Sequence, residues 1–148
     1  MDDIKLKYIG QGLYLGEGSK TKRNSLNFVN GDPRLCRIMV DWFVRIYKVP
    51  ITKIAVDITA HSPFDDLKLK KFWSEYLDIP ITQIKGVHTY KKSGTRGKRR
   101  ENGFCRLNVY DTALAKKVFI ELGLMSEKDF IDRRRTLPLV ALGARDAL

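Results

Sequence analysis

The 148-residue chain is predicted to form an α+β domain with a short antiparallel sheet, helices on one face and the other face open. Some segments have apolar residues at helical spacing, and in others apolar and polar residues alternate. A chain with 43% hydrophobic residues at this length can bury a core without disulfides. The formal net charge of +11 favours polyanionic partners, first of all nucleic acid, although such a surplus can also serve solubility alone.

The first half of the chain begins with a helix expected over residues 4–16, although its glycines lower the helix propensity by up to about 1 kcal/mol each. A strand over 25–30 follows. Asp32 is then a typical N-cap residue, and Pro33 suits the first position of a helix. We expect this helix to run over 33–48, because its apolar residues form one continuous stripe.

The middle of the chain predicts a half-buried strand at 54–60, where apolar and polar residues alternate. A second amphipathic helix should begin near Pro63, capped by Ser62, and stop before Pro80. The segments VPITKI and IPITQI follow the two helices in the same way. They are either a duplicated helix–strand unit or one corner used twice.

The last elements are two strands, at 84–90 and 104–110, which flank a long basic segment and are predicted to pair as a hairpin. A final helix should begin after Asp111 or Thr112 and end at Gly123. Residues 1–123 thus form the predicted domain. Residues 124–148 are expected to be a C-terminal extension packed on it.

Several classes of protein do not fit the sequence. Cys36 and Cys105 form no CxxC pair, and with His61 and His88 they do not match metal-ligand spacings, so we expect free thiols and a cytoplasmic protein. No apolar run reaches the roughly 20 residues that cross a bilayer, and the start of the chain does not resemble a signal peptide. Serine, histidine and acidic residues form no recognisable hydrolytic triad.

The polar sides of the strands can form one open surface suited to phosphates and base edges, the alternative being an ordinary solvated face. The basic segment KKSGTRGKRR favours nucleic acid, because lysines and arginines among glycines can follow a phosphate backbone; a solvated loop is the alternative. The predicted DNA-binding residues are Asn27, Lys53, Asp57, Thr59, His61, Gln83, Lys85, Thr89, Lys91, Lys92, Arg96, Lys98, Arg99, Arg100, Arg106 and Asn108.

The glycine-rich segment YIGQGLYLGEGSK fits neither a Walker phosphate loop nor a dinucleotide-binding fingerprint. It reads better as a helix whose small residues let another backbone approach, ended by Gly18 and carrying Glu17 in its last turn. The helix dipole disfavours a carboxylate there by a few tenths to about 1 kcal/mol. A bound cation would offset this cost, unless Glu17 is simply solvated or paired with Lys20 or Lys22.

The stretch GQGLYLGEG resembles the LAGLIDADG motif of homing endonucleases. It matches that motif at Gly12, Leu13, Glu17 and Gly18. Gly16 stands where the motif has another small residue. The later segments FVNGDP, KKFW and GFCRLNV extend the resemblance over roughly residues 6–122.

This resemblance implies a Mg²⁺- or Mn²⁺-dependent endonuclease that binds double-stranded DNA. Because the chain has a single motif, the family pattern requires a homodimer. Its expected interface residues are Gly12, Leu13, Leu15 and Gly16; Glu17 and Gly16 are the expected metal positions, and Glu17 is the expected catalytic acid. Lys20 and Lys91 are further expected catalytic residues, inferred from their position and charge and not from the motif.

Two further functions remain open on the sequence. One is a DNA-binding regulator on the same scaffold that does not cut. The other is an RNA-binding or splicing helper, in which Tyr90, Phe104 and Tyr110 would stack on unpaired bases.

Overall fold

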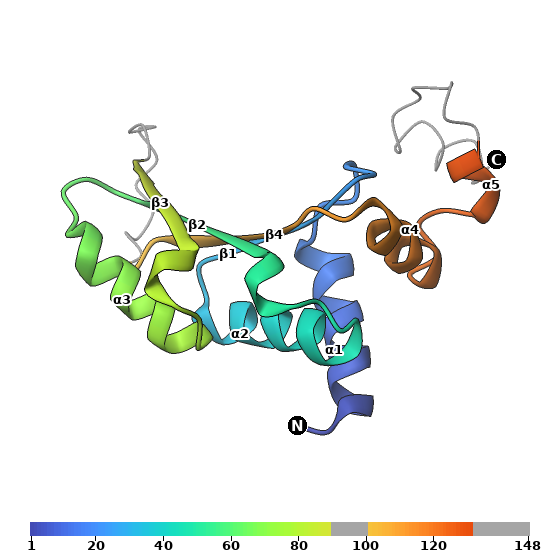
Figure 1. Cartoon of the computed structure of the whole chain (residues 1–148), viewed down its shortest axis with the longest axis horizontal. Coiled ribbons are helices and arrows are strands. Elements are labelled where there is room, and N and C mark those ends of the chain that lie inside the picture. The colour runs from blue at the N-terminus through green and yellow to red at the C-terminus, as the bar shows by residue number, and fades with distance from the viewer. Residues whose placement is uncertain (90–100, 132–148) are drawn as a thin grey trace.

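The computed structural model of the chain describes residues 1–89 and 101–131 and has the predicted α+β fold. A four-stranded sheet has the order β1-β4-β2-β3. One layer of helices, α1, α2 and α3, lies on one side of this sheet, and α4 and α5 follow at the end near α1 (Figure 1). The elements are α1 (Asp3–Glu17), β1 (Leu26–Asn30), α2 (Pro33–Asp41), β2 (Ile54–Ala60), α3 (Asp66–Leu77), β3 (Ile84–Thr89), β4 (Phe104–Val109), α4 (Thr112–Glu121) and α5 (Glu127–Ile131).

The sheet is mixed, so the prediction of an antiparallel sheet is wrong. β4 is antiparallel to both β1 and β2, whereas β2 and β3 are parallel and are connected through α3. The predicted hairpin is also wrong, because β2 lies between β3 and β4. Periodicity locates a strand but does not name its partner, and a crossover helix allows sequential strands to run parallel.

The helix boundaries follow local capping. Asp32 caps α2, where its carboxylate accepts a hydrogen bond from the Arg34 amide at 2.9 Å, and Pro33 is the first helical residue, as predicted. α2 continues through a π-helical turn, Trp42–Ile46, so the helical segment ends slightly earlier than expected. The prediction for α3 is corrected: its N-cap is Asp65, not Ser62.

The two similar segments form corners with the same backbone. Each has one residue with positive φ, Lys48 at 57° and Asp78 at 54°. Each then passes through a proline into a 3₁₀ turn, Ile51–Lys53 or Ile81–Gln83, and on into a parallel strand. Both interpretations of the repeated segment, duplication and one corner used twice, agree with this conformation.

The core lies between the helical layer and the sheet. Its largest members, all fully buried, are Trp42, Trp73, Tyr14, Phe28, Phe43 and Phe119. Cys36 and Cys105 are buried free thiols in the same core, as predicted, and burial raises the pKa of Cys105. Because these side chains fill the space beneath the sheet, a large ligand can reach the sheet only on its opposite face or along its edges and ends.

Candidate nucleic-acid interface

The face of the sheet opposite the helical layer presents polar side chains from its central strands. In β2, Ile54, Val56, Ile58 and Ala60 are buried, while the residues between them are only partly buried. Asp57 and Thr59 therefore belong to the open face, and exposed Arg106 of β4 lies directly opposite Asp57. The arginine can contact base edges and phosphates, and the carboxylate can accept a hydrogen bond from a base amino group.

A bulge in the β2–β3 ladder decides which residues of β3 join this face. Val56 pairs with Ile84, but the next residue, Asp57, pairs with Gly86, so Lys85 is the extra residue. His88 consequently lies on the open face, where its Nε2 is 3.7 Å from Asp57 Oδ1. His88 was not among the predicted contact residues, because simple alternation from Ile84 cannot reveal a bulge.

The bulge also changes the face on which Thr89 lies, so the prediction that it belongs to the open face is corrected. Thr89 pairs with Ala60, a core residue of β2, and so belongs to the side of the sheet that the helices cover. Lys85 is exposed at the bulge.

Two asparagines predicted to lie free on the open face are buried there. Asn27 of β1 and Asn108 of β4 are direct partners in the ladder, with exposed fractions of 9% and 3%. The Asn27 side-chain amide donates a hydrogen bond to Asn108 Oδ1. The expectation that these groups are free is therefore wrong, because alternation predicts a face but not whether neighbouring atoms cover it.

Gln83 is likewise occupied within the chain. Its Nε2 donates to the carbonyl oxygens of Ile51 and Ile54, which ties the second corner to the first, so its side chain is not free as expected. Lys53 is exposed at the end of its 3₁₀ turn, and His61 is half-buried just after β2. The other predicted contact residues, Lys91, Lys92, Arg96, Lys98, Arg99 and Arg100, lie outside the described residues.

Packing inside the chain fixes the end of α1. Tyr14 is fully buried; its hydroxyl donates to the Ser19 carbonyl at 2.7 Å and accepts from the Asn27 amide at 3.2 Å. Burial raises the pKa of Tyr14 to about 12. A Cβ at Gly18 would lie 2.6 Å from the Tyr14 ring, so only glycine allows this close turn. The helix end, and with it Glu17, is held against β1.

Lys20 supplies a cation at the carboxyl end of α1. Its Nζ donates to the carbonyl oxygens of Leu15, at 2.9 Å, and Gly18, at 2.8 Å. A positive charge there complements the helix dipole. Lys20 thus places a positive charge at the same helix end as the exposed Glu17, although its hydrogen bonds go to backbone carbonyl oxygens and not to that carboxylate.

The outward side of α1 is an exposed apolar stripe, made of Ile4, Tyr8, Ile9, Gly12, Leu15 and Gly16. Tyr8 and Leu15 are 64% and 42% exposed. A Cβ added at Gly12 or Gly16 would meet no atom within 4 Å. Leu13, predicted as an interface residue, is instead half-buried and packs on the core of its own chain.

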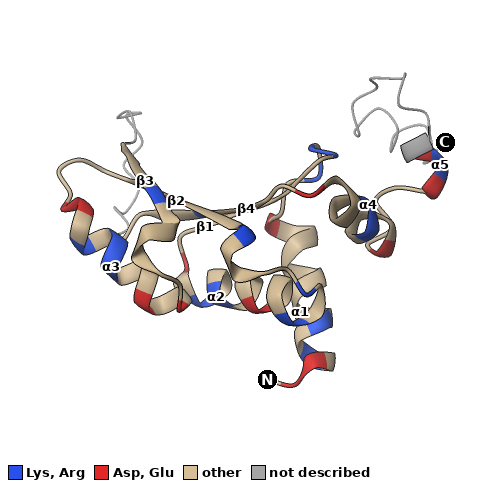
Figure 2. Cartoon of the chain, viewed as in Figure 1, with Lys and Arg blue, Asp and Glu red and all other residues tan. Residues whose placement is uncertain are grey.

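Basic residues accompany these surfaces. Figure 2 shows lysine and arginine positions in the loop after α1 and near the beginnings of β2 and β3, which correspond to Lys20, Lys22, Arg23, Lys53 and Lys85.

Comparison with family models and with curated proteins finds no match for this chain. The site must therefore be judged on its own geometry.

The described residues contain no group of three or more histidine, cysteine, aspartate or glutamate side chains that could hold a metal ion. Glu17 and the neighbouring Gly16 carbonyl are two residues that could supply oxygen ligands from each chain. Within residues 1–89 and 101–131, no helix has the length and apolar character required to cross a membrane.

Proposed function

We propose that the protein is a sequence-specific DNA endonuclease of the LAGLIDADG type that works as a homodimer with Mg²⁺ or Mn²⁺. The observation that carries this proposal is the apolar stripe of α1, which the rest of the described chain leaves exposed and which runs to the helix end that bears Glu17. Glycines at two of its positions allow a second helix to approach closely. Two copies in contact there would contribute two Glu17 carboxylates to one site.

The residues at this helix end fit a hard divalent ion. Carboxylate and carbonyl oxygens, here from Glu17 and Gly16, are the ligands that Mg²⁺ prefers, and the exposed position leaves room for a phosphate. When bound, such an ion lowers the pKa of water and stabilises a leaving oxygen. The hydrogen bonds of Tyr14 and Lys20 to backbone carbonyl oxygens would hold the helix end that carries Glu17 in place.

The open face would bind the duplex beside this centre. Arg106 can donate two hydrogen bonds to a guanine edge, and the Thr59 hydroxyl can bond to either kind of base edge or to phosphate. Lys53 and Lys85 would neutralise phosphates and release counterions, so binding should weaken steeply with salt.

The decisive experiment incubates wild-type protein with a randomised duplex library and Mg²⁺ and sequences the ends produced. Glu17→Gln should abolish cutting and leave binding of the same duplex largely intact. Glu75→Gln, an exposed glutamate on α3, is the matched control and should cut normally. Cutting at the wild-type rate by Glu17→Gln would contradict the proposed role of this carboxylate.

A DNA-binding regulator that does not cut is the second candidate. One observation favours it: the Lys20 ammonium is engaged by two backbone carbonyl oxygens, which limits its use as a catalytic cation. Wild-type protein that binds duplex tightly and never nicks it with either metal ion would decide for this candidate.

A further inference from the structure

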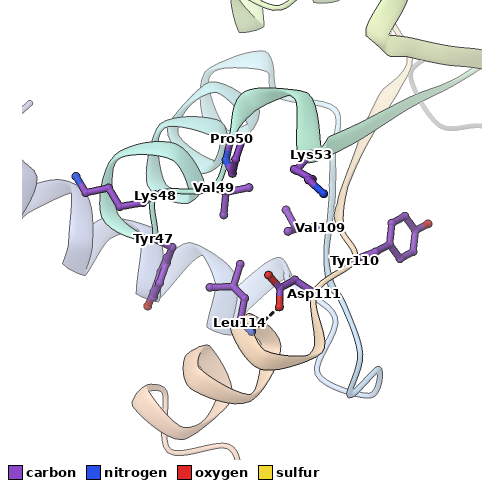
Figure 3. A pocket seen from close by; sticks show the side chains of 9 residues that line it. All are labelled: Tyr47, Lys48, Val49, Pro50, Lys53, Val109, Tyr110, Asp111 and Leu114. Carbon is purple, nitrogen blue, oxygen red and sulfur yellow. Dashed lines mark hydrogen bonds between the residues drawn. The ribbon is translucent and has the colours of Figure 1, made fainter.

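A small hollow lies at the first corner, where the end of β4 meets the turn that precedes β2. Its volume is about 190 Å³, and it is lined by Val49, Lys53, Val109, Tyr110, Asp111 and Leu114, among others. Figure 3 shows the valine and leucine side chains on the inner walls, with Lys53 and Asp111 at the side of β4. This is smaller than the sites of about 300–1,000 Å³ that hold drug-sized ligands, and it suits one small planar group.

The walls of the hollow are fixed by contacts within the chain. Tyr47, on the far side, donates a hydrogen bond to Glu121 at 2.6 Å and packs edge-on against Trp42. Asp111 caps α4 by accepting a hydrogen bond from the Leu114 amide at 3.0 Å. The hollow is therefore already formed in the protein alone, and a ligand would pay little for ordering it.

Charge and polarity indicate a neutral ligand with both donors and acceptors. Lys53 is a donor and Asp111 an acceptor, and their opposite charges lie beside the apolar walls; Lys48 also lines the hollow, but Figure 3 shows its side chain directed away from it. A phosphate would be repelled by Asp111 and would gain nothing from Val49, Val109 and Leu114. A nucleobase is planar, neutral and apolar on its faces, and its edge carries donors and acceptors.

The hollow lies at the end of the sheet, beside the open face. Val109 of β4 pairs with Ile54, a core residue of β2, and so lies on the helix-covered side, whereas Lys53 and Tyr110, the next residues along the chain, flank this pair at the sheet's end. Tyr110 is 70% exposed, and Figure 3 shows its ring directed outward. An exposed aromatic ring beside a nucleic-acid interface is a platform on which a base can stack.

We propose that this hollow receives one unpaired base of the nucleic acid bound on the open face, with Tyr110 stacking on that base or its neighbour. The inference rests on the proposed function, because it places an unpaired-base site next to the duplex site. Lys53 and Asp111 bond to the edge of the base, and Val49, Val109 and Leu114 contact its faces. The ligand is defined by an unpaired base, which either DNA or RNA can supply.

The test measures binding of fluorescently labelled duplexes by anisotropy at one fixed salt concentration. A DNA duplex with a single unpaired nucleotide is compared with the fully paired duplex, and an RNA duplex with the same bulge forms a third arm. We expect wild-type protein to bind the bulged DNA roughly tenfold more tightly than the paired DNA, since stacking of one base on an aromatic ring strengthens binding.

Variants assign the preference to the hollow. Tyr110→Ala and Lys53→Ala should each reduce the preference severalfold, and Leu114→Trp, which fills the hollow, should abolish it. Tyr76→Ala and Lys71→Ala, on α3, are the matched controls and should keep it. Circular dichroism checks the fold of Leu114→Trp; the exposed Tyr110 and Lys53 decide the matter if that variant does not fold.

The outcomes separate this inference from the proposed function. Equal binding of paired and bulged duplexes overturns the inference and leaves the DNA proposal standing, as does an equal loss in Tyr76→Ala and Tyr110→Ala. A preference for the bulge without binding of paired DNA supports the inference and contradicts the endonuclease. A stronger preference in the RNA arm supports the site and assigns it to RNA. Binding of neither duplex overturns both.

Discussion

The two sides of α1 differ in what determines their residues. The inward side, with Leu6, Gly10 and Tyr14, is completely enclosed by the rest of the chain. A Cβ at Gly10 would lie 2.1 Å from the Trp42 ring, and the Trp42 indole donates to the Lys7 carbonyl at 3.2 Å. The outward side has glycines too, but a Cβ at Gly12 would meet no atom within 4 Å.

This difference shows that the glycines of α1 need two separate explanations. Gly10 is explained by packing within the chain, because no side chain fits beneath the indole. Among the described residues nothing requires glycine at Gly12 or Gly16, where glycine lowers helix stability by roughly 0.5–1 kcal/mol relative to alanine. Close approach of a second helix backbone would explain why glycine is present there despite this cost.

The largest effect should come from a charge on the outward side. Leu15→Lys would place an ammonium in the proposed dimer contact of both copies, each of which loses roughly 1.5–3 kcal/mol of leucine burial. We expect the dimer dissociation constant, measured by sedimentation, to rise about a hundredfold or more. Leu67→Lys, at a leucine 61% exposed on α3, is the control and should leave it unchanged. A wild-type protein that is monomeric at high concentration would contradict the comparison itself.

A matched pair of alanine substitutions tests the two sides within one chain. Gly10→Ala forces a methyl group against Trp42 and should lower the free energy of unfolding by about 1–3 kcal/mol. Gly12→Ala should raise it by about 0.5–1 kcal/mol, because alanine favours the helix and nothing obstructs it. Urea unfolding of dilute protein measures both values. If both substitutions change the free energy of unfolding in the same direction, the proposed difference between the two sides of α1 is wrong.

Loss of the Tyr14 hydroxyl, on the inward side, should lower the free energy of unfolding somewhat less than Gly10→Ala does. Tyr14→Phe removes the hydrogen bonds to the Ser19 carbonyl and from the Asn27 amide, and should cost about 1–2 kcal/mol at pH 7. The measurement is chemical unfolding, with Tyr8→Phe, at an exposed tyrosine of the outward side, as the control.

The same tyrosine predicts a pH dependence with a definite sign. The pKa of Tyr14 is about 12 in the folded protein and about 10 in the unfolded chain, so the folded state favours the protonated phenol. Its contribution is complete below pH 10 and is lost as pH rises from 10 to 12. The stability difference between wild type and Tyr14→Phe should therefore shrink in that window. A difference independent of pH would mean that Tyr14 is not buried as described.

The smallest effect should be seen where the two sides meet, at the helix end. Lys20→Ala removes the ammonium that bonds to the Leu15 and Gly18 carbonyl oxygens, and should lower stability by about 0.3–1 kcal/mol. High salt should reduce this difference. Lys22→Ala, at an exposed lysine in the same loop, should change stability less. If the two substitutions cost the same, the cap contributes nothing specific.

Local signals predicted the elements well. Asp32 and Pro33 mark the beginning of α2, and alternation identifies β2, because capping and burial on one face depend only on residues close in sequence. The corners at Pro50 and Pro80 were likewise visible as repeated segments. The candidate site was predicted less completely: Asp57, Thr59 and Arg106 were placed correctly, but His88 was missed.

The sequence by itself determined which segments become helices and strands, and which side chains are apolar, basic or acidic. Only the tertiary structure decided that β2 separates β3 from β4, that a bulge turns His88 toward the open face, and that Asn27 is bonded to Asn108. It also decided which glycine of α1 lies beneath Trp42. The reason is that strand pairing, register and the burial of a side chain depend on contacts between residues far apart in the chain. No local sequence pattern predicts these contacts.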